Sequence, residues 1–211
     1  MQMDLYANQI VDVMSRYAAS GTSLSLAALA GAKQFSQWQH YPTDDVIDTD
    51  HGTEFYYHAH PVDGGGDTKR WGSNGGSVEH GHFHVFCRSN AGRRFHHLVG
   101  ISLNDRGLPT QLFLTNQWVT GEAWVSANRA RVMRSRFQCS AAGRLAPVAR
   151  WVSAMVHLYG DEIDALHQSR EQWVNRRASD PAGRRQLLQS RDFHVIAQTP
   201  VDLMVLLKNF S

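Results

Sequence analysis

Cysteine is scarce in this sequence, and long apolar runs are missing. The two cysteines, Cys87 and Cys139, are too few for a disulfide framework and fit a reducing compartment. No stretch approaches the roughly 20 apolar residues that a membrane-spanning helix needs. Residues 1–14 contain two aspartates and no basic segment ahead of an apolar one, so they do not resemble a secretory signal. We therefore expect a cytoplasmic protein without a membrane partner.

The sequence also has little excess of charge of either sign. Its formal net charge is +2, which is too small to indicate nucleic-acid binding. Four arginines between residues 129 and 136 spread around a predicted helix and do not form one basic stripe. The glycine-rich runs lack the lysine that a phosphate-binding P-loop requires. We expect no nucleic-acid partner, and a small molecule is the candidate substrate.

Apolar and aromatic residues, by contrast, suffice for a folded core. The chain is 42% hydrophobic with six tryptophans, which suits one globular domain over residues 1–211. Apolar residues recur at helical spacing over residues 4–19. Thr22 or Ser23 can cap a second helix that runs to about Trp38. The helical parts are thus predicted at residues 1–40, at the N-terminus, and at residues 125–211, a mainly helical C-terminal part.

Between these helical parts, residues 53–116 show the alternation of a sheet. Strands are predicted at residues 53–60, 79–88, 94–103 and 110–116. The acidic segment 43–52 is predicted as a turn, and the glycine-rich segment 61–76 as a loop that serves as a lid. The tail, residues 193–207, can add a short strand and a last helix. The predicted fold class is α+β, an antiparallel β-meander of about four strands flanked by N-terminal and C-terminal helices, which cover one sheet face.

Histidine is concentrated on the predicted sheet. Eight of the twelve histidines lie between residues 51 and 97, and they are His51, His58, His60, His80, His82, His84, His96 and His97. Alternate residues of a strand point to one face, and opposed residues of paired strands lie about 4.5–5.5 Å apart at Cβ. Imidazoles from two neighbouring strands can therefore converge on one ion. The candidate metal ligands are His58, His60, His82 and His84, followed by His80, and the ion is divalent zinc, iron, copper, nickel or manganese.

Gly81 interrupts this pattern, because glycine within a strand often marks a bulge. A bulge there would turn His80 away and leave His82 with His84. Regular alternation places Glu79 on the opposite face, so that Glu54 is the nearest carboxylate on the histidine face. His96 and His97 alternate with each other, so at most one of the two can join the cluster.

Two local motifs resemble known families. Residues 75–86, GGSVEHGHFHVF, resemble the histidine-triad motif of nucleotide hydrolases and transferases. That resemblance implies that His82 attacks an α-phosphate and that His84 assists at the phosphate. Gly52 followed by His58 and His60 is similar to the start of the first cupin motif, although the glutamate of that motif is missing.

A third resemblance extends over most of the chain. The segments HYPTDDVID, YYHAHP, EHGHFHVF and LFLTNQWVTGEAW, in this order, look like an uncharacterised bacterial domain family of about this length. Membership would imply a shared fold without an established activity.

Three functions stay open from the sequence. The first is a metal-dependent protein, possible as an enzyme, with His82 and Glu122 as candidate catalytic groups. The second is a metal-free hydrolase or transferase of the histidine-triad type that uses His82 as its nucleophile. The third is a non-enzymatic ligand-binding or interaction domain. In LFLTNQWVTGEAW, Asn116 and Glu122 are candidates for holding a ligand imidazole in one tautomer, and the alternative is a crossover anchored by tryptophans.

Overall fold

The computed structural model describes residues 2–32, 39–59, 79–89 and 93–208. In chain order, its elements are α1 (Gln2–Ala19), α2 (Leu24–Ala28), β1 (Tyr41–Asp48), β2 (Thr53–Ala59), β3 (Glu79–Ser89), β4 (Arg94–Asn104), β5 (Pro109–Thr115), α3 (Gln117–Thr120), α4 (Ala127–Ser135), the 3₁₀ turn η1 (Gly143–Leu145), α5 (Ala146–Leu158), α6 (Gly160–Arg177), α7 (Pro181–Gln189), β6 (Val195–Pro200) and α8 (Leu203–Leu207). This order confirms the α+β class. The glycine-rich segment predicted as a lid lies outside the described residues.

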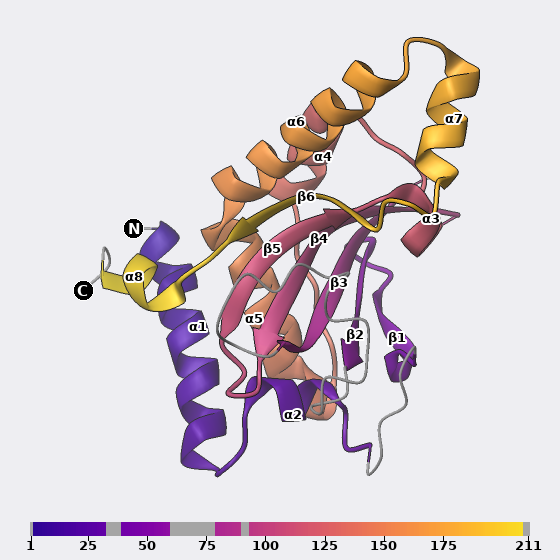
Figure 1. Cartoon of the computed structure of the whole chain (residues 1–211). Coiled ribbons are helices and arrows are strands. Elements are labelled where there is room, and N and C mark those ends of the chain that lie inside the picture. The colour runs from indigo at the N-terminus through magenta and orange to yellow at the C-terminus, as the bar shows by residue number, and fades with distance from the viewer. Residues whose placement is uncertain (1, 33–38, 60–78, 90–92, 209–211) are drawn as a thin grey trace.

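The strands form one antiparallel sheet in the order β1-β2-β3-β4-β5-β6 (Figure 1). The prediction of about four strands is therefore wrong, because β1 precedes the predicted meander and β6 is added after the helices. β6 occupies the tail, where a short strand and a last helix are both found as predicted. It returns through α4–α7 to pair with β5.

β1 was mistaken for a turn because its acidic residues interrupt the pairing. Tyr41 pairs with Tyr57, whereas the next registered pair is Val46 with Phe55, so residues 42–45 are looped out of the ladder. Asp45 has a φ of 52°, in the left-handed region that aspartate tolerates better than most residues. The strand is held at its two ends by buried Tyr41 and Val46.

The N-terminal helices follow the sequence prediction in position more closely than in length. α1 matches the predicted helix over residues 4–19 within two residues. The Ser23 hydroxyl caps α2 by accepting from Leu26 N. α2 ends at Ala28, however, well before Trp38, because Ala30 and Gly31 adopt positive φ values that are incompatible with a continuing helix.

The helices cover one face of the sheet. The histidine cluster, formed by His58, His82 and His84, lies on the other face. In Figure 1, α5 runs behind the strands, and α6 lies along the β6 side of the sheet. Trp151 of α5 packs on Phe83 of β3 with ring centroids 5.8 Å apart, and both side chains are fully buried. Phe83 alternates with His82 and His84, so these two histidines point away from the helices. Among the described residues, no helix combines the length and apolarity needed to cross a membrane.

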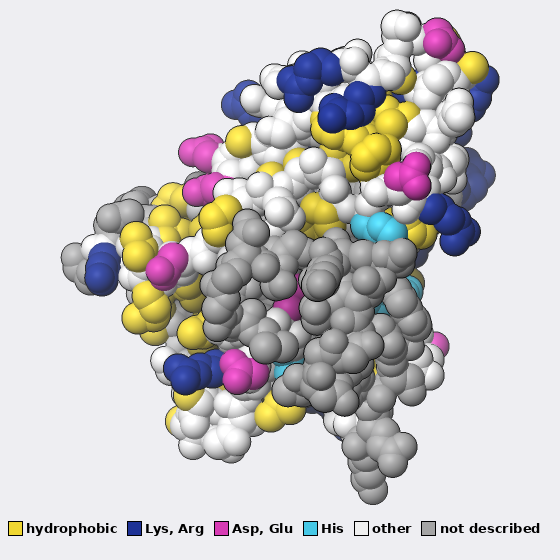
Figure 2. Space-filling model, in the orientation of Figure 1, with side chains coloured by type: hydrophobic (Ala, Val, Ile, Leu, Met, Phe, Trp, Pro, Cys, Tyr) yellow, Lys and Arg dark blue, Asp and Glu magenta, His cyan; other side chains and the backbone are white. Residues whose placement is uncertain are grey.

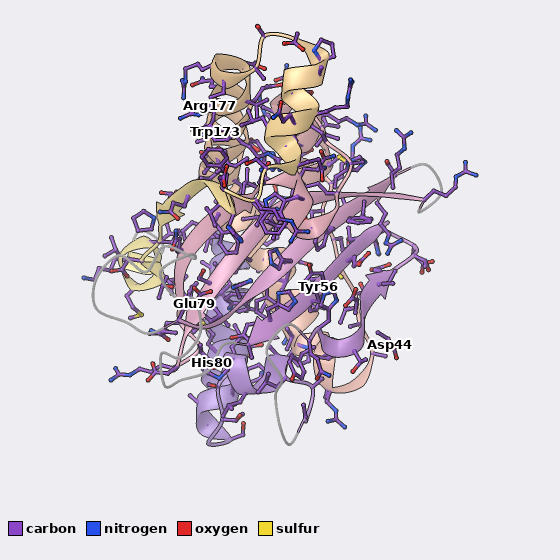
Figure 3. All side chains as sticks on the ribbon, turned by 45° about the vertical axis from the view of Figure 1, so that its right-hand side comes forward. Asp44, Tyr56, Glu79, His80, Trp173 and Arg177 are labelled. Atoms are coloured by element: carbon purple, nitrogen blue, oxygen red, sulfur yellow. The ribbon has the colours of Figure 1, made fainter. Side chains whose placement is uncertain are left out.

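Apolar and basic side chains meet at the α6–α7 end of the molecule (Figure 2). The Arg177 guanidinium lies 4.4 Å from the ring centroid of Trp173, and the Trp173 ring contacts Phe193 edge-on. Trp173 and Arg177 lie on α6, far from His80 at the opposite end of the sheet (Figure 3). This surface is therefore separate from the histidine cluster.

Candidate metal centre

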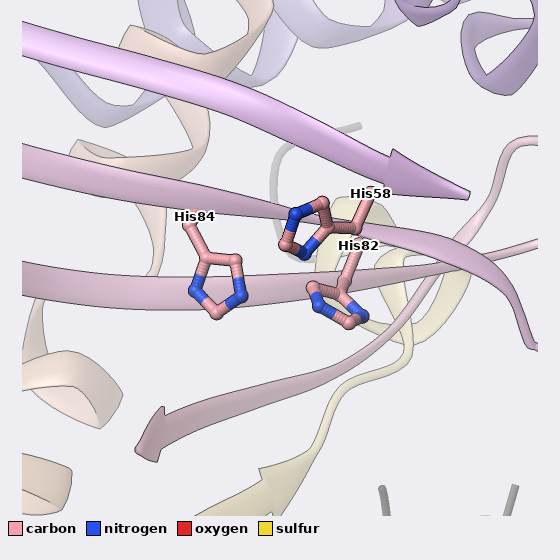
Figure 4. A group of neighbouring side chains, drawn as sticks. All are labelled: His58, His82 and His84. Carbon is pink, nitrogen blue, oxygen red and sulfur yellow. The ribbon is translucent and has the colours of Figure 1, made fainter. Parts of the chain in front are cut away.

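Three histidines from β2 and β3 converge on the sheet face opposite α5. His58 is the direct cross-strand partner of His82, and His84 follows two residues along β3 on the same face. One ring nitrogen from each of His58, His82 and His84 lies within 4.8 Å of the others, and Figure 4 shows the rings turned toward one another. We call these three residues the histidine cluster. The two-strand convergence predicted from the sequence is present for them, and a group so arranged could hold a metal ion.

Of the two remaining predicted ligands, His80 is not part of this cluster. His60 lies outside the described residues. The ladder shifts register between Glu79 and Gly81, and the His80 ring reaches the Tyr57 hydroxyl, with Nδ1 and the hydroxyl oxygen 2.9 Å apart. Gly81 is required at this position, because a Cβ atom would lie 2.7 Å from the Tyr57 hydroxyl oxygen. The bulge inferred from Gly81 thus separates His80 from His82 as expected.

The same irregularity brings a carboxylate to the cluster that regular alternation placed on the other face. Glu79 Oε1 lies 2.8 Å from His82 Nδ1. Because a carboxylate accepts, the Nδ1–H of His82 is the donor, and Nε2 is left as the nitrogen for a ligand. Glu54, which we expected to be the nearest carboxylate, instead accepts from Arg88 Nε at 2.5 Å. Figure 3 shows Glu79 and His80 together at the end of β3.

His97 extends the cluster onto β4. Its Nε2 lies 3.1 Å from His84 Nδ1, and its Nδ1 lies 3.3 Å from the Thr115 hydroxyl of β5. His96 points elsewhere, with its Nδ1 donating to the Ala123 carbonyl at 2.6 Å. Of the two adjacent histidines His97 therefore contacts the cluster and His96 does not, in line with the expectation that at most one of them can join.

His40 is a neighbour of the cluster that the sequence analysis missed. Its ring stacks on Tyr56 with centroids 3.7 Å apart and lies 4.9 Å from the ring of His58. Its Nδ1 lies 2.7 Å from Asp45 Oδ1, in the looped-out part of β1. The sequence offered no signal for this placement, because it depends on the irregular pairing of β1.

Aromatic rings enclose the cluster on two sides. Tyr56 lies 5.0 Å from the ring of His58 and 5.2 Å from that of His84. Phe113 of β5 lies 5.2 Å from the ring of His82 and 5.7 Å from that of His84, nearly perpendicular to both. The Phe113 ring lies over Gly100 of β4, where only hydrogen leaves it room.

Burial keeps the imidazoles of His82 and His84 uncharged. It lowers the pKa of His82 to about 3. The pKa of His84 lies well below its ordinary value because of burial, reinforced by the neighbouring histidines, first of all His82. Burial and the nearby Asp45 raise the pKa of Tyr56 above its ordinary value. At neutral pH His82 and His84 are therefore in the neutral form that a metal ligand needs.

Phe113 and Thr115 of the stretch LFLTNQWVTGEAW contact the site, whereas Asn116 and Glu122, the two residues singled out from it, make other contacts. Glu122 forms a buried ion pair with Arg170 Nη1 at 2.6 Å and accepts from the Thr120 hydroxyl. The Arg170 guanidinium lies 4.4 Å from the Trp124 ring centroid. Asn116 Nδ2 donates to two carbonyls near the end of α7. These contacts match the tryptophan-anchored alternative, and the residue of the stretch that lies within hydrogen-bond distance of a histidine of the site is Thr115.

Comparison with known proteins adds a family and no activity. Neither the curated proteins nor the solved structures include a significant match to the chain. One family model, described as Domain of unknown function (DUF6969), matches residues 4–201. The match includes the strands, the histidine cluster and the covering helices. The chain therefore belongs to this domain family of unknown function.

Proposed function

We propose that this protein binds one divalent transition-metal ion through ring nitrogens of His58, His82 and His84. The observation that carries the proposal is the mutual approach of the three nitrogens within 4.8 Å. Ligands at about 2.0–2.1 Å from a common ion lie within about 4.2 Å of one another, so small rotations of the rings suffice. The three residues sit on paired neighbouring strands, which limits how far the donors must move.

The contact between Glu79 and His82 supports the same proposal. Metal-bound histidines almost always donate their second ring N–H to a carboxylate, carbonyl or water. Glu79 Oε1 is such an acceptor at His82 Nδ1. A ligand set of imidazoles suits zinc, iron(II), copper, nickel or manganese better than magnesium or calcium, which prefer oxygen ligands.

Three ligands converge among the described residues, and this number fits a catalytic metal site. Structural zinc sites are closed by four protein ligands, whereas catalytic ones use three and leave a position for water or substrate. A bound ion there would act as a Lewis acid or lower the pKa of water. The chain's own contribution is to keep His82 and His84 neutral and to place Tyr56 and Phe113 against the cluster, which restricts bulk water.

Elemental analysis of protein purified without a histidine tag tests the proposal. We expect near-stoichiometric metal in the wild type and loss of metal in His82→Ala. His51→Ala is the matched control, because the His51 ring pairs with Asp48 outside the cluster. Metal-free wild-type protein whose stability does not change with added zinc or chelator would refute the proposal.

The same measurement separates this proposal from two metal-free alternatives, and other experiments distinguish those two from each other. A nucleotide hydrolase or transferase of the histidine-triad type requires a phosphohistidine at His82, detectable by mass spectrometry after reaction with a nucleoside phosphoramidate. A non-enzymatic domain predicts that changes at His82 and His84 alter stability alone.

A further inference from the structure

We propose that His97 and Thr115 fix the tautomer of His84, and that a β-bulge held by His167 places His97 for this role. The inference rests on the proposed function, because it concerns how well His84 binds a metal ion. His97 does not itself belong to the three converging nitrogens. It is therefore a positioning residue, which acts through His84.

The three side chains form a buried chain across β3, β4 and β5. His84 Nδ1 lies 3.1 Å from His97 Nε2, and His97 Nδ1 lies 3.3 Å from Thr115 Oγ1. None of the three residues is more than 1% exposed. Because bulk water does not compete at such depth, the hydrogen atoms in this chain are set by the side chains themselves.

Only one direction of these hydrogen bonds leaves His84 able to bind a metal ion. A neutral imidazole has one N–H and one lone pair. If His84 Nδ1 donates to His97, then His84 Nε2 carries the lone pair that an ion needs, and His97 Nδ1–H donates to Thr115. If His97 Nε2 donates instead, His84 Nε2 bears hydrogen and cannot bind. Thr115 selects the first arrangement whenever its oxygen accepts.

His97 reaches the metal face because β4 is irregular. Val99 pairs with Val85, but His97 pairs with the adjacent Phe86, so Leu98 is an extra residue in the ladder. Regular alternation would place His97 on the same face as Val99, beneath the helices. The bulge turns it to the opposite face, a use of bulges that is common near functional sites.

A side chain of α6 contacts this bulge. His167 Nε2 donates to the Leu98 carbonyl at 2.8 Å, and His167 is 2% exposed. The Leu98 carbonyl belongs to the extra residue of the bulge, and the His167 N–H hydrogen-bonds to it from the helix side. His167 thus holds the bulge, the bulge places His97, and His97 fixes the tautomer of His84.

Zinc titration against a chromogenic chelator tests the relay. His97→Phe keeps a ring of similar size and removes the acceptor, and we expect zinc affinity to fall by about 10–100-fold. His97→Gln places an amide oxygen near the position of Nε2 and should bind zinc almost as the wild type does. A His97→Phe variant with wild-type affinity would overturn the inference.

His96→Gln is the matched control for general damage to β4. His96 is buried on the same strand and is held by Ser89 and Ala123, away from the cluster. It should lose stability without losing zinc affinity, and an equal loss of affinity in His96→Gln and His97→Phe would overturn the inference.

A second readout works even if His97→Phe does not fold. ¹⁵N NMR of zinc-loaded wild-type protein should show hydrogen on Nδ1 of His97, and hydrogen on Nε2 would contradict the relay. Thr115→Val should weaken zinc binding while Thr115→Ser retains it. If the wild type binds no zinc, the proposed function fails and this inference with it, whereas zinc binding that is unaffected at His97 and Thr115 removes the inference alone.

Discussion

Gly100→Ala is expected to destabilise the protein through Phe113. A Cβ atom on Gly100 would lie 2.5 Å from Phe113 Cε1 and closer still to two other atoms of that ring. Ordinary contacts between carbon atoms begin at about 3.5 Å, so the ring must move by about 1 Å or more. Phe113 is 2% exposed and has no empty space into which to move without disturbing its neighbours. Overpacking of this kind costs about 1–3 kcal/mol in the free energy of unfolding.

The displaced ring would also press on the candidate ligands. Phe113 contacts the rings of His82 and His84, so Gly100→Ala should weaken zinc binding as well as stability. Denaturant unfolding and zinc titration of the same samples measure both effects. Gly183→Ala in α7 is the control, since there the new methyl group meets only Asp180 and Ala178 at 3.3 Å or more and helix propensity rises.

A double substitution decides whether Phe113 is the cause. Phe113→Leu alone should lose stability by leaving a cavity, but it should cost less on the Gly100→Ala background because the smaller side chain relieves the clash. Additive losses in Gly100→Ala/Phe113→Leu, or wild-type stability in Gly100→Ala, would refute the reasoning.

The remaining predictions concern the contacts around the histidine cluster, the buried ion pair and the buried histidines. Glu79→Gln should weaken zinc binding by about 10–100-fold in a chelator competition, and unchanged affinity would deny Glu79 its role. Zinc at 100 times its dissociation constant should add about 2.7 kcal/mol to the unfolding free energy of the wild type and nothing to His82→Ala. Glu122→Ala should cost about 3–5 kcal/mol in denaturant unfolding, because Arg170 stays buried without its partner, and Arg170→Met on that background should recover part of the loss. Metal-free protein should lose stability as pH falls from 6.5 toward 3. The pKa of His82 and that of His167 are about 3 in the folded state and about 6.5 in the unfolded state, so the unfolded state binds more protons in this range. An unfolding free energy that does not change over this pH range would contradict the prediction.

Period-two alternation predicted the part of the site that lies on regular backbone. The approach of His58 to His82 and His84 follows from two strands that pair without interruption. Glycine chemistry also foretold the irregularity at Gly81 and the departure of His80. These features depend on local sequence, and local sequence was sufficient to find them.

Two of the missed residues, His97 and His40, depend on contacts between distant segments. His97 reaches the cluster through a register shift in β4, and His40 is held beside the cluster by the looped-out Asp45 of β1. Glu79 was missed for a local reason, because the irregularity expected at Gly81 was applied to His80 alone. The bulge before His97 is accompanied by a hydrogen bond from His167, 69 residues away in α6. β1 was missed because its acidic residues, of which Asp45 is looped out, are typical of a turn and not of a strand. None of these shifts leaves a periodic signal that a reader of the sequence can detect.

The direct opposition of His58 and His82 has a consequence for how the sheet assembles. A slip of β2 by one residue would send His58 to the side of the sheet that Phe55 and Tyr57 now occupy, and would leave Tyr57 or Ala59 facing His82. In the proposed metal-bound form, an ion shared by β2 and β3 is compatible with a single alignment of these strands. Metal binding would then favour the correct alignment of β2 with β3. Chelation during refolding should therefore increase the fraction of misaligned, aggregation-prone chains.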